Sequence, residues 1–130
     1  MTNVERVFSG APWEKNVGYC RAIRAGAHVY VSGTAPVAEG GGVFAPGDAY
    51  AQTKRCFEIA FAAMKKLGAE PRHVVRTRMY VTDIGRWNDY GRAHGELFHD
   101  HPPATAMVEV SALIDPSMLV EVEMEAVVDP

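Results

Sequence analysis

Three glutamates near the C-terminus alternate with apolar residues, in the order Val120-Glu121-Val122-Glu123-Met124-Glu125-Ala126. Because side chains alternate across a β-strand, the glutamates share one face of the strand and the apolar residues share the other. Carboxylates this close repel one another, so in an enclosed site at least one gains a raised pKa or pairs with a cation. Such a carboxyl can donate a proton or activate water. The spacing therefore predicts an acidic sheet face that has the chemistry for acid–base catalysis.

Two interpretations of this acidic face remain open from spacing alone. A sheet face exposed to water can carry the same alternation. Alternatively, a subunit interface or cleft covers the carboxylates, and Arg76 and Arg78, which alternate on their own predicted strand, supply the cations. Glu109 and Ser111 join the acidic face if their strand lies beside it.

Other patterns that could carry chemistry are weaker. The segment His99-Asp100-His101 lies between a predicted helix and Pro102, and no third metal ligand is suitably spaced. Gly40-Gly41-Gly42 lacks the Lys-Ser/Thr that follows a phosphate-binding loop. Cys20 could be a nucleophile if a base activated it, or a buried structural thiol. We therefore predict no metal and no cofactor.

The composition is that of a globular protein with one domain over residues 1–130. The formal net charge is -3 and the 13 Lys and Arg residues are scattered, so nucleic acid is not an expected partner. The N-terminus lacks the pattern of a secretory signal, and no apolar run is long enough to span a membrane. Cys20 and Cys56 lack the paired spacing of a disulfide framework. These features predict a cytoplasmic protein.

Eight elements are expected along the chain. They are strands at residues 4–8, 19–24 and 28–33, a helix at 48–67, a strand at 73–82, a helix at 87–98, and strands at 105–113 and 118–128. Asp48 can cap the first helix and Gly68 can end it. An apolar stripe with helical spacing comprises Thr53, Cys56, Phe57, Ala60, Ala63, Met64 and Leu67. The polar residues off that stripe are Gln52, Arg55, Lys65 and Lys66.

This order of elements predicts an α+β fold with one mixed β-sheet and two helices on one face. The apolar side of the last strand is expected beneath the helices. The opposite face of the sheet then needs cover, which is the first indication of an oligomer.

Several ordered segments of the chain resemble the RidA/YjgF family, whose members deaminate reactive enamines and imines. The similarity runs from Val17-Gly18-Tyr19 to Ala126. Its strongest stretches are Val31-Ser32-Gly33-Thr34, Asp48-Ala49-Tyr50-Ala51-Gln52-Thr53, Arg76-Thr77-Arg78-Met79-Tyr80-Val81-Thr82-Asp83, Pro102-Pro103-Ala104, Met107-Val108-Glu109-Val110 and Leu119-Val120-Glu121-Val122-Glu123.

The resemblance implies a chorismate-mutase-like fold that assembles as a homotrimer, with the sheets forming a central barrel and small-molecule sites at the subunit interfaces. By position, Tyr19 and Ser32 match residues of the family's ligand pocket. The backbone around Gly33 and Met107 would bind ligand, and Glu121 matches the acid that positions or activates water.

The chain departs from the family pattern at Thr105. Deaminating members carry an arginine there that binds the substrate carboxylate, and a threonine offers only one neutral hydroxyl. Either the ligand lacks that carboxylate, or Arg21, Arg24 or Arg78 reaches the site instead. Trp13 resembles a subgroup of sequences with this departure and could cover an enlarged pocket, or pack as a surface indole. Trp13 and Arg78 are therefore accessory candidates.

The leading functional hypothesis is a trimer that hydrolyses a reactive imine, enamine or related C–N bond, with Glu121 carrying the chemistry. The rival hypothesis is a non-catalytic metabolite-binding protein on the same scaffold, which the change at Thr105 favours. Ribonuclease activity, a label that some relatives carry, is a third reading, and the acidic charge balance argues against it.

Overall fold

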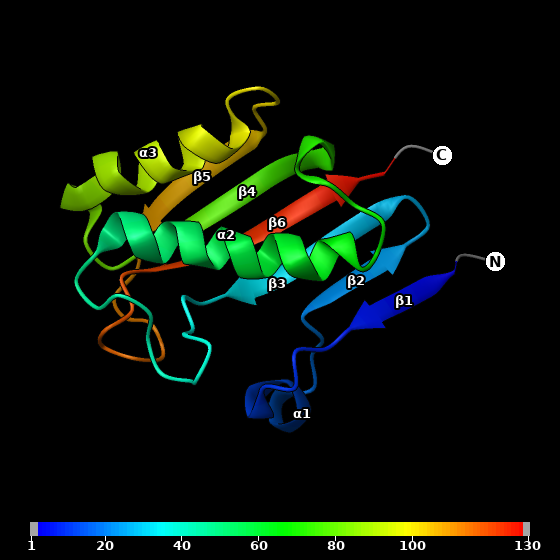
Figure 1. The fold of residues 1–130 in the computed structure, drawn as a ribbon, viewed down its shortest axis with the longest axis horizontal. Coiled ribbons are helices and arrows are strands. Elements are labelled where there is room, and N and C mark those ends of the chain that lie inside the picture. The colour runs from blue at the N-terminus through cyan, green and yellow to red at the C-terminus, as the bar shows by residue number, and fades with distance from the viewer. Residues whose placement is uncertain (1–2, 129–130) are drawn as a thin grey trace.

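The computed structural model describes residues 3–128 and contains six strands, three α-helices and two 3₁₀ turns (Figure 1). In chain order these are β1 (Val4–Val7), α1 (Pro12–Val17), β2 (Ala22–Ala25), β3 (His28–Thr34), α2 (Ala49–Lys65), η1 (Pro71–His73), β4 (Val74–Val81), η2 (Ile84–Arg86), α3 (Trp87–Phe98), β5 (Ala104–Glu109) and β6 (Val120–Val127). Apart from α1 and the two 3₁₀ turns, they correspond to the elements predicted from sequence.

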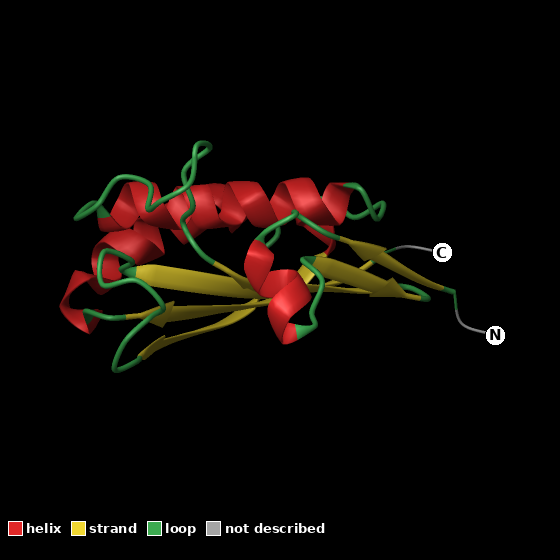
Figure 2. Ribbon diagram, turned by 90° about the horizontal axis from the view of Figure 1, so that it is seen from below, coloured by secondary structure: helices red, strands yellow, loops and turns green. Residues whose placement is uncertain are grey.

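All six strands form one sheet in the order β1-β2-β3-β6-β4-β5. The β4–β5 pair is parallel and every other pair is antiparallel, so the sheet is mixed, as predicted. Both α2 and α3 lie on one face of the sheet (Figure 2). The α+β class and the one-sided helical layer are confirmed.

The pairing of the last strand corrects one expectation. β6 lies between β3 and β4, whereas β5 is the edge strand and pairs with β4. Because Glu109 pairs with the buried Val81, its side chain belongs to the helical side and accepts a hydrogen bond from the Ile84 N–H at 3.0 Å. Ser111 lies beyond the end of β5. Neither residue joins the acidic face.

The first long helix, α2, begins and buries its face as its sequence predicts. The Asp48 side chain accepts a hydrogen bond from the Ala51 N–H at 2.9 Å, which satisfies one of the unpaired donors at the helix start. The chain turns at Gly68 with φ +85°, a conformation that favours glycine. Every residue of the predicted apolar stripe, from Thr53 to Leu67, is buried.

Gln52 differs from the simple pattern of a buried apolar stripe, because it lies off that stripe and is nevertheless fully buried. Its amide nitrogen donates to the carbonyl of Ser117 at 2.9 Å, and its amide oxygen accepts from the Leu119 N–H at 2.8 Å. The side chain therefore ties α2 to the loop that leads into β6. A buried amide is tolerated here because its hydrogen bonds are satisfied.

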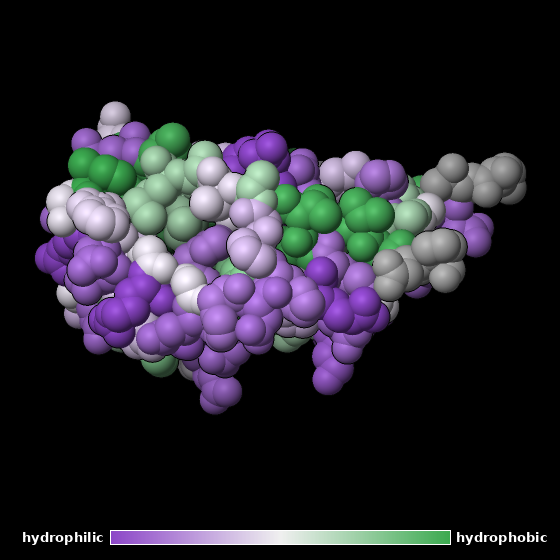
Figure 3. All heavy atoms as spheres, turned by 90° about the horizontal axis from the view of Figure 1, so that it is seen from above, coloured by the Kyte–Doolittle hydropathy of each residue, from purple (hydrophilic) through white to green (hydrophobic). Residues whose placement is uncertain are grey.

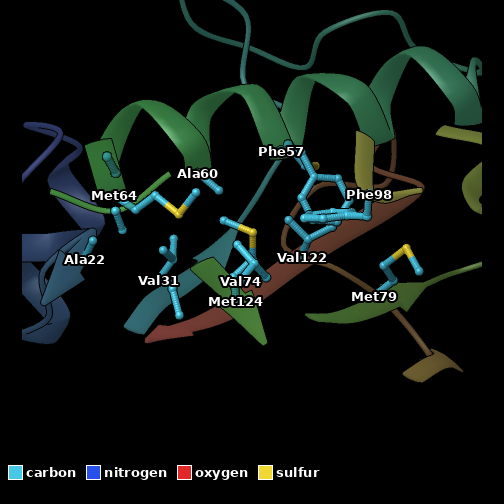
Figure 4. Packing of buried hydrophobic residues seen from close by; sticks show 14 of the residues in the cluster. Ala22, Val31, Phe57, Ala60, Met64, Val74, Met79, Phe98, Val122 and Met124 are labelled. Atoms are coloured by element: carbon cyan, nitrogen blue, oxygen red, sulfur yellow. The ribbon is translucent and has the colours of Figure 1, made fainter. Parts of the chain in front are cut away.

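The hydrophobic core fills the layer between α2, α3 and the sheet (Figure 4). Phe57 of α2 meets Phe98 of α3 edge-on, with ring centroids 5.3 Å apart. The four apolar residues of β6 that alternate with the glutamates lie beneath the helices and are buried, namely Val120, Val122, Met124 and Ala126. This packing fixes which side of β6 faces the helices, and it leaves the three glutamates on the open face of the sheet.

The short helix α1 is absent from the sequence-based expectation and lies at the end of β1, away from α2 and α3 (Figure 1). It starts with Pro12 at its first position and ends at Gly18, whose φ is +91°. The strand predicted from residue 19 begins only at Ala22. Residues 19–21 instead form the connection between α1 and the sheet.

The edge formed by α3 and β5 exposes both polar and apolar residues (Figure 3). Trp87 and Val108 keep 60% and 45% of their surface exposed. Across residues 3–128, no helix has both the length and the apolar character needed to cross a membrane.

Candidate ligand-binding site around Glu121

The three glutamates of β6 share the open face of the sheet, but their partners differ. Glu125 lies 3.8 Å from Arg76 Nε and from Arg78 Nη1. Glu123 lies 3.4 Å from Arg78 Nη1 and accepts a hydrogen bond from the Tyr80 hydroxyl at 2.6 Å. The two strand arginines thus pair with carboxylates, as the sequence suggested.

Glu121 has neither an ion pair nor a hydrogen bond to its carboxylate among residues 3–128. It pairs in register with Tyr80, whose hydroxyl is already directed to Glu123. Desolvation by partial burial raises the pKa of Glu121, and the neighbouring Glu123 raises it further. The raised pKa makes the Glu121 carboxyl better suited to proton transfer than an ordinary glutamate.

A glycine makes room for this carboxylate. Ser32 and Gly33 lie where the register between β3 and β6 shifts, between Val31 and Thr34. A Cβ atom placed on Gly33 would lie 2.7 Å from Glu121 Oε2, closer than real side chains approach. The missing side chain at Gly33 allows the Glu121 carboxyl to rest against the backbone of β3.

Ser32 is linked to the segment after α1 by a hydrogen bond, and the Tyr19 ring lies beside the guanidinium of Arg21. The Ser32 hydroxyl donates to the carbonyl of Cys20 at 2.7 Å, which joins β3 to the segment after α1. Arg21 donates from Nη2 to the carbonyl of Gly33, and its guanidinium carbon lies 5.6 Å from the centre of the Tyr19 ring. One chain therefore brings together Tyr19, Ser32, Gly33 and Glu121, four of the six residues predicted for the ligand site.

Next to Tyr19 and Gly33, Arg21 forms a buried ion pair with Glu14 of α1. Arg21 keeps 8% of its surface exposed and Glu14 keeps 4%. The distance between Arg21 Nη1 and Glu14 Oε2 is 4.0 Å, and Glu14 Oε1 accepts a hydrogen bond from the Ser9 N–H at 2.9 Å. Sequence reasoning missed Glu14. Its only signal was its place in the first turn after Pro12, where an acid is favourable.

The positive charge of Arg21 lowers the pKa of Glu121 and so opposes the effect of burial. We predict that the double variant Arg21→Met/Glu14→Gln has a higher Glu121 pKa than the wild type, because the attraction to Arg21 is lost. Changing both residues leaves no buried charge alone, which limits the loss of stability. The measurement is an NMR titration of the Glu121 side-chain carboxyl carbon. Arg24→Met is the control, because Arg24 binds the carbonyl of Leu67 elsewhere. An unchanged or lower pKa in the double variant would contradict this assignment.

Thr105 and Met107 lie on β5, two strands away from Glu121 and on the helical side of the sheet, so one chain does not bring them to the Glu121 cluster. The Thr105 hydroxyl accepts a hydrogen bond from Thr77 at 2.7 Å, and the Thr77 hydroxyl lies 2.8 Å from His94 Nε2. Burial lowers the pKa of His94, which favours its neutral form. The Thr105 hydroxyl is thus held by a hydrogen-bonded chain of hydroxyl and imidazole groups.

The accessory candidates lie on either side of the cluster. Trp13 of α1 keeps 54% of its surface exposed, next to the buried Glu14. Arg78 lines a concave part of the open sheet face with a volume of about 230 Å³, together with Tyr30, Ser32 and Glu123. Ser32 therefore borders both this hollow and the Glu121 cluster. Within the described part of the chain, no three His, Cys, Asp or Glu side chains are grouped to hold a metal ion.

Comparisons with known proteins agree with the family resemblance. Residues 11–128 match the family model described as endoribonuclease L-PSP. An uncharacterised protein of Streptomyces coelicolor is 41% identical over 123 residues, which cover 95% of this chain and 91% of that protein. A protein of Acinetobacter baylyi named 3-aminoacrylate deaminase RutC is 32% identical and covers 80% of this chain, with 82% of its own length matched.

A solved structure from Mycobacterium tuberculosis, described as a member of the YjgF/YER057c/UK114 family, superimposes with a TM-score of 0.88. It is 42% identical and covers 97% of this chain and 100% of its own.

Proposed function

Since the chain belongs to the RidA/YjgF family, we propose that it is a small-molecule hydrolase that deaminates a reactive imine or enamine. The observation that carries this proposal is the state of Glu121, which has a raised pKa, no partner for its carboxylate among residues 3–128, and a place beside Gly33 and Ser32. The deaminase name of the Acinetobacter baylyi relative supports the same reaction class.

We further propose that the site forms between subunits of a homotrimer in the cytoplasm. Tyr19, Ser32, Gly33 and Glu121 would come from one subunit, and Thr105 and Met107 from its neighbour. Two features support this assembly. Among residues 3–128, no helix or strand covers the sheet face opposite α2 and α3 (Figure 2), and β5 is an edge strand. A cleft at that place would bring both sets of residues to one ligand.

In the proposed reaction, Glu121 takes a proton from water as the water oxygen adds to the carbon of the C=N bond. For a protonated imine, Glu121 then returns this proton to the nitrogen of the resulting carbinolamine. As the C–N bond breaks and the C=O bond forms, Glu121 accepts the carbinolamine hydroxyl proton, which passes to the released ammonia. The products are a carbonyl compound and ammonia. The Tyr19 and Ser32 hydroxyls would hydrogen-bond the ligand, and the Gly33 and Met107 backbone groups would position it.

The proposal is tested with the purified full-length protein. Sedimentation is expected to give three times the mass of the chain. Ammonia release is expected to be faster with the protein than without it, for freshly generated 2-aminoacrylate or for imines that lack a carboxylate. A monomer would contradict the shared site, and an unchanged rate for every imine would contradict the hydrolase.

A non-catalytic metabolite-binding protein is the second candidate, and the neutral Thr105 favours it. It predicts that a small molecule is retained without turnover of any imine. Ribonuclease activity has little electrostatic support, because the formal net charge is -3 and the open sheet face carries three glutamates. RNA cleavage that persists through repeated purification and in Glu121→Gln would revive it.

A further inference from the structure

We propose that the substrate is an iminium cation without a carboxylate, derived from an amine rather than from an amino acid. This inference rests on the proposed function and names the substrate class of the same site. It is based on the charged residues around Glu121 and Thr105 and on the ion pairs and hydrogen bonds that these residues already form.

Within residues 3–128, each arginine near Glu121 already has a carboxylate or carbonyl partner. Arg21 is directed to the Gly33 carbonyl and to Glu14, and its buried Nε has no hydrogen-bond partner within residues 3–128. Because that atom is enclosed by protein, a ligand that approaches from solvent does not reach it. Arg21 therefore has a structural role, in which it connects Glu14 to the Gly33 carbonyl.

The other two arginines that could replace the family's arginine are also engaged. Arg24 donates to the carbonyl of Leu67 at 2.7 Å and to the carbonyl of Gly26 at 2.8 Å. Leu67 is a buried residue that follows α2, and Arg24 pairs in register with the buried Val29. Arg24 therefore lies on the helical side of the sheet, away from Glu121. Arg78 pairs with Glu123 and Glu125.

Thr105 and Met107, the residues proposed to come from the neighbouring subunit, carry no charge. The Thr105 hydroxyl accepts from Thr77, so its own proton is free to be donated, and neutral His94 supports Thr77 from behind. Two acidic side chains, Glu14 and Glu121, face one basic side chain, Arg21, so the formal charges of this cluster sum to -1 before a ligand binds. A carboxylate would add to this negative charge, whereas an iminium cation would neutralise it.

The cationic ligand also fits the proposed chemistry. A positive charge beside Glu121 favours the ionised form of its carboxyl, which is the form that takes a proton from water. The balanced reaction is R₂C=NH₂⁺ plus water giving R₂C=O plus NH₄⁺. The water oxygen forms the new C–O bond and the C=N electrons move to nitrogen, while Glu121 carries the first water proton to that nitrogen. The C–N bond then breaks as the hydroxyl loses the second water proton to Glu121, and this proton passes to ammonia to give NH₄⁺.

Two imines that differ only in the carboxylate test this inference. A flavin amine oxidase converts 3-methylbutylamine, and a flavin amino-acid oxidase converts leucine, into imines with the same isobutyl side chain. We expect the wild type to hydrolyse the carboxylate-free imine with a kcat/KM about ten- to a hundredfold higher, since the carboxylate finds no charged partner. In Thr105→Arg this preference is expected to reverse.

Ser111→Arg is the matched control, because it adds the same charge on the exposed loop after β5 and is expected to keep the wild-type preference. Calorimetric binding of 3-methylbutylammonium and of 4-methylpentanoate gives a second readout that needs no turnover. Tighter binding of the ammonium ion would support the inference, whether or not an imine is hydrolysed. A lack of imine hydrolysis would contradict only the proposed hydrolase activity. Tighter binding of the carboxylate, or binding of neither ion, would overturn the inference.

Discussion

Replacing Glu121 with glutamine is expected to lower the turnover of an imine substrate by roughly a hundred- to ten-thousand-fold, the contribution typical of a positioned acid–base group. Glutamine keeps the shape of the side chain next to Gly33 but accepts no proton. The fold should persist, because the carboxylate of Glu121 makes no hydrogen bond or ion pair with residues 3–128. Ammonia release measures the turnover, and sedimentation checks the assembly.

Glu125→Gln is the matched control for this experiment. It changes the same residue type on the same strand and face, but Glu125 pairs with Arg76 and Arg78 and has no part in the proposed proton transfer. Its turnover is expected to stay close to that of the wild type. If Glu121→Gln kept the wild-type rate, Glu121 would have no role in the reaction.

The pH dependence of the wild type follows from the same assignment. The active form of Glu121 is ionised, because only that form takes a proton from water. Burial raises the pKa of Glu121, so kcat/KM should fall with decreasing pH at a higher pH than an ordinary glutamate would produce. In Arg21→Met/Glu14→Gln this acid limb should move to still higher pH. A rate that instead falls as the pH rises through that pKa would identify Glu121 as a proton donor.

The sequence allowed the elements to be predicted where the pattern is local. The cap at Asp48 and the apolar stripe specify α2, and the strict alternation from Val120 to Ala126 specifies β6 and its two faces. The short helix α1 was missed, because six residues carry too little periodicity. The signals that mark it, Pro12 at its first position and Gly18 at its end, are weak alone.

The parts that could not be predicted depend on contacts between distant residues. Gln52 resembles a solvated helix residue until Ser117 and Leu119, more than 60 positions later, are placed against it. The position of β6 between β3 and β4 is likewise a matter of pairing, which the strand pattern does not encode. The residues near Glu121 were found through the family resemblance. The ion pair of Glu14 with Arg21 became visible only in three dimensions.

Adding one methyl group at Gly33 should disable the site without harming the fold. The backbone of Gly33 is outside the positive-φ region, so alanine can adopt it. The new Cβ would lie 2.7 Å from Glu121 Oε2 and 3.3 Å from Cδ, which forces the carboxyl away from β3. A displacement of about 1 Å can cost on the order of a hundredfold in rate, so kcat/KM is expected to fall by about that factor.

The free energy of unfolding of Gly33→Ala should remain within about 1 kcal/mol of the wild-type value, because the clash is with the end of a side chain and alanine restricts the unfolded chain. Gly95→Ala is the control, since a Cβ there meets no atom within 4 Å. Glu121→Asp shortens the displaced side chain, so Gly33→Ala should cost less in the Glu121→Asp background than in the wild type. Equal costs in the two backgrounds would mean that the methyl group does not act through Glu121, and that the close approach of Gly33 to this carboxyl has no part in positioning it.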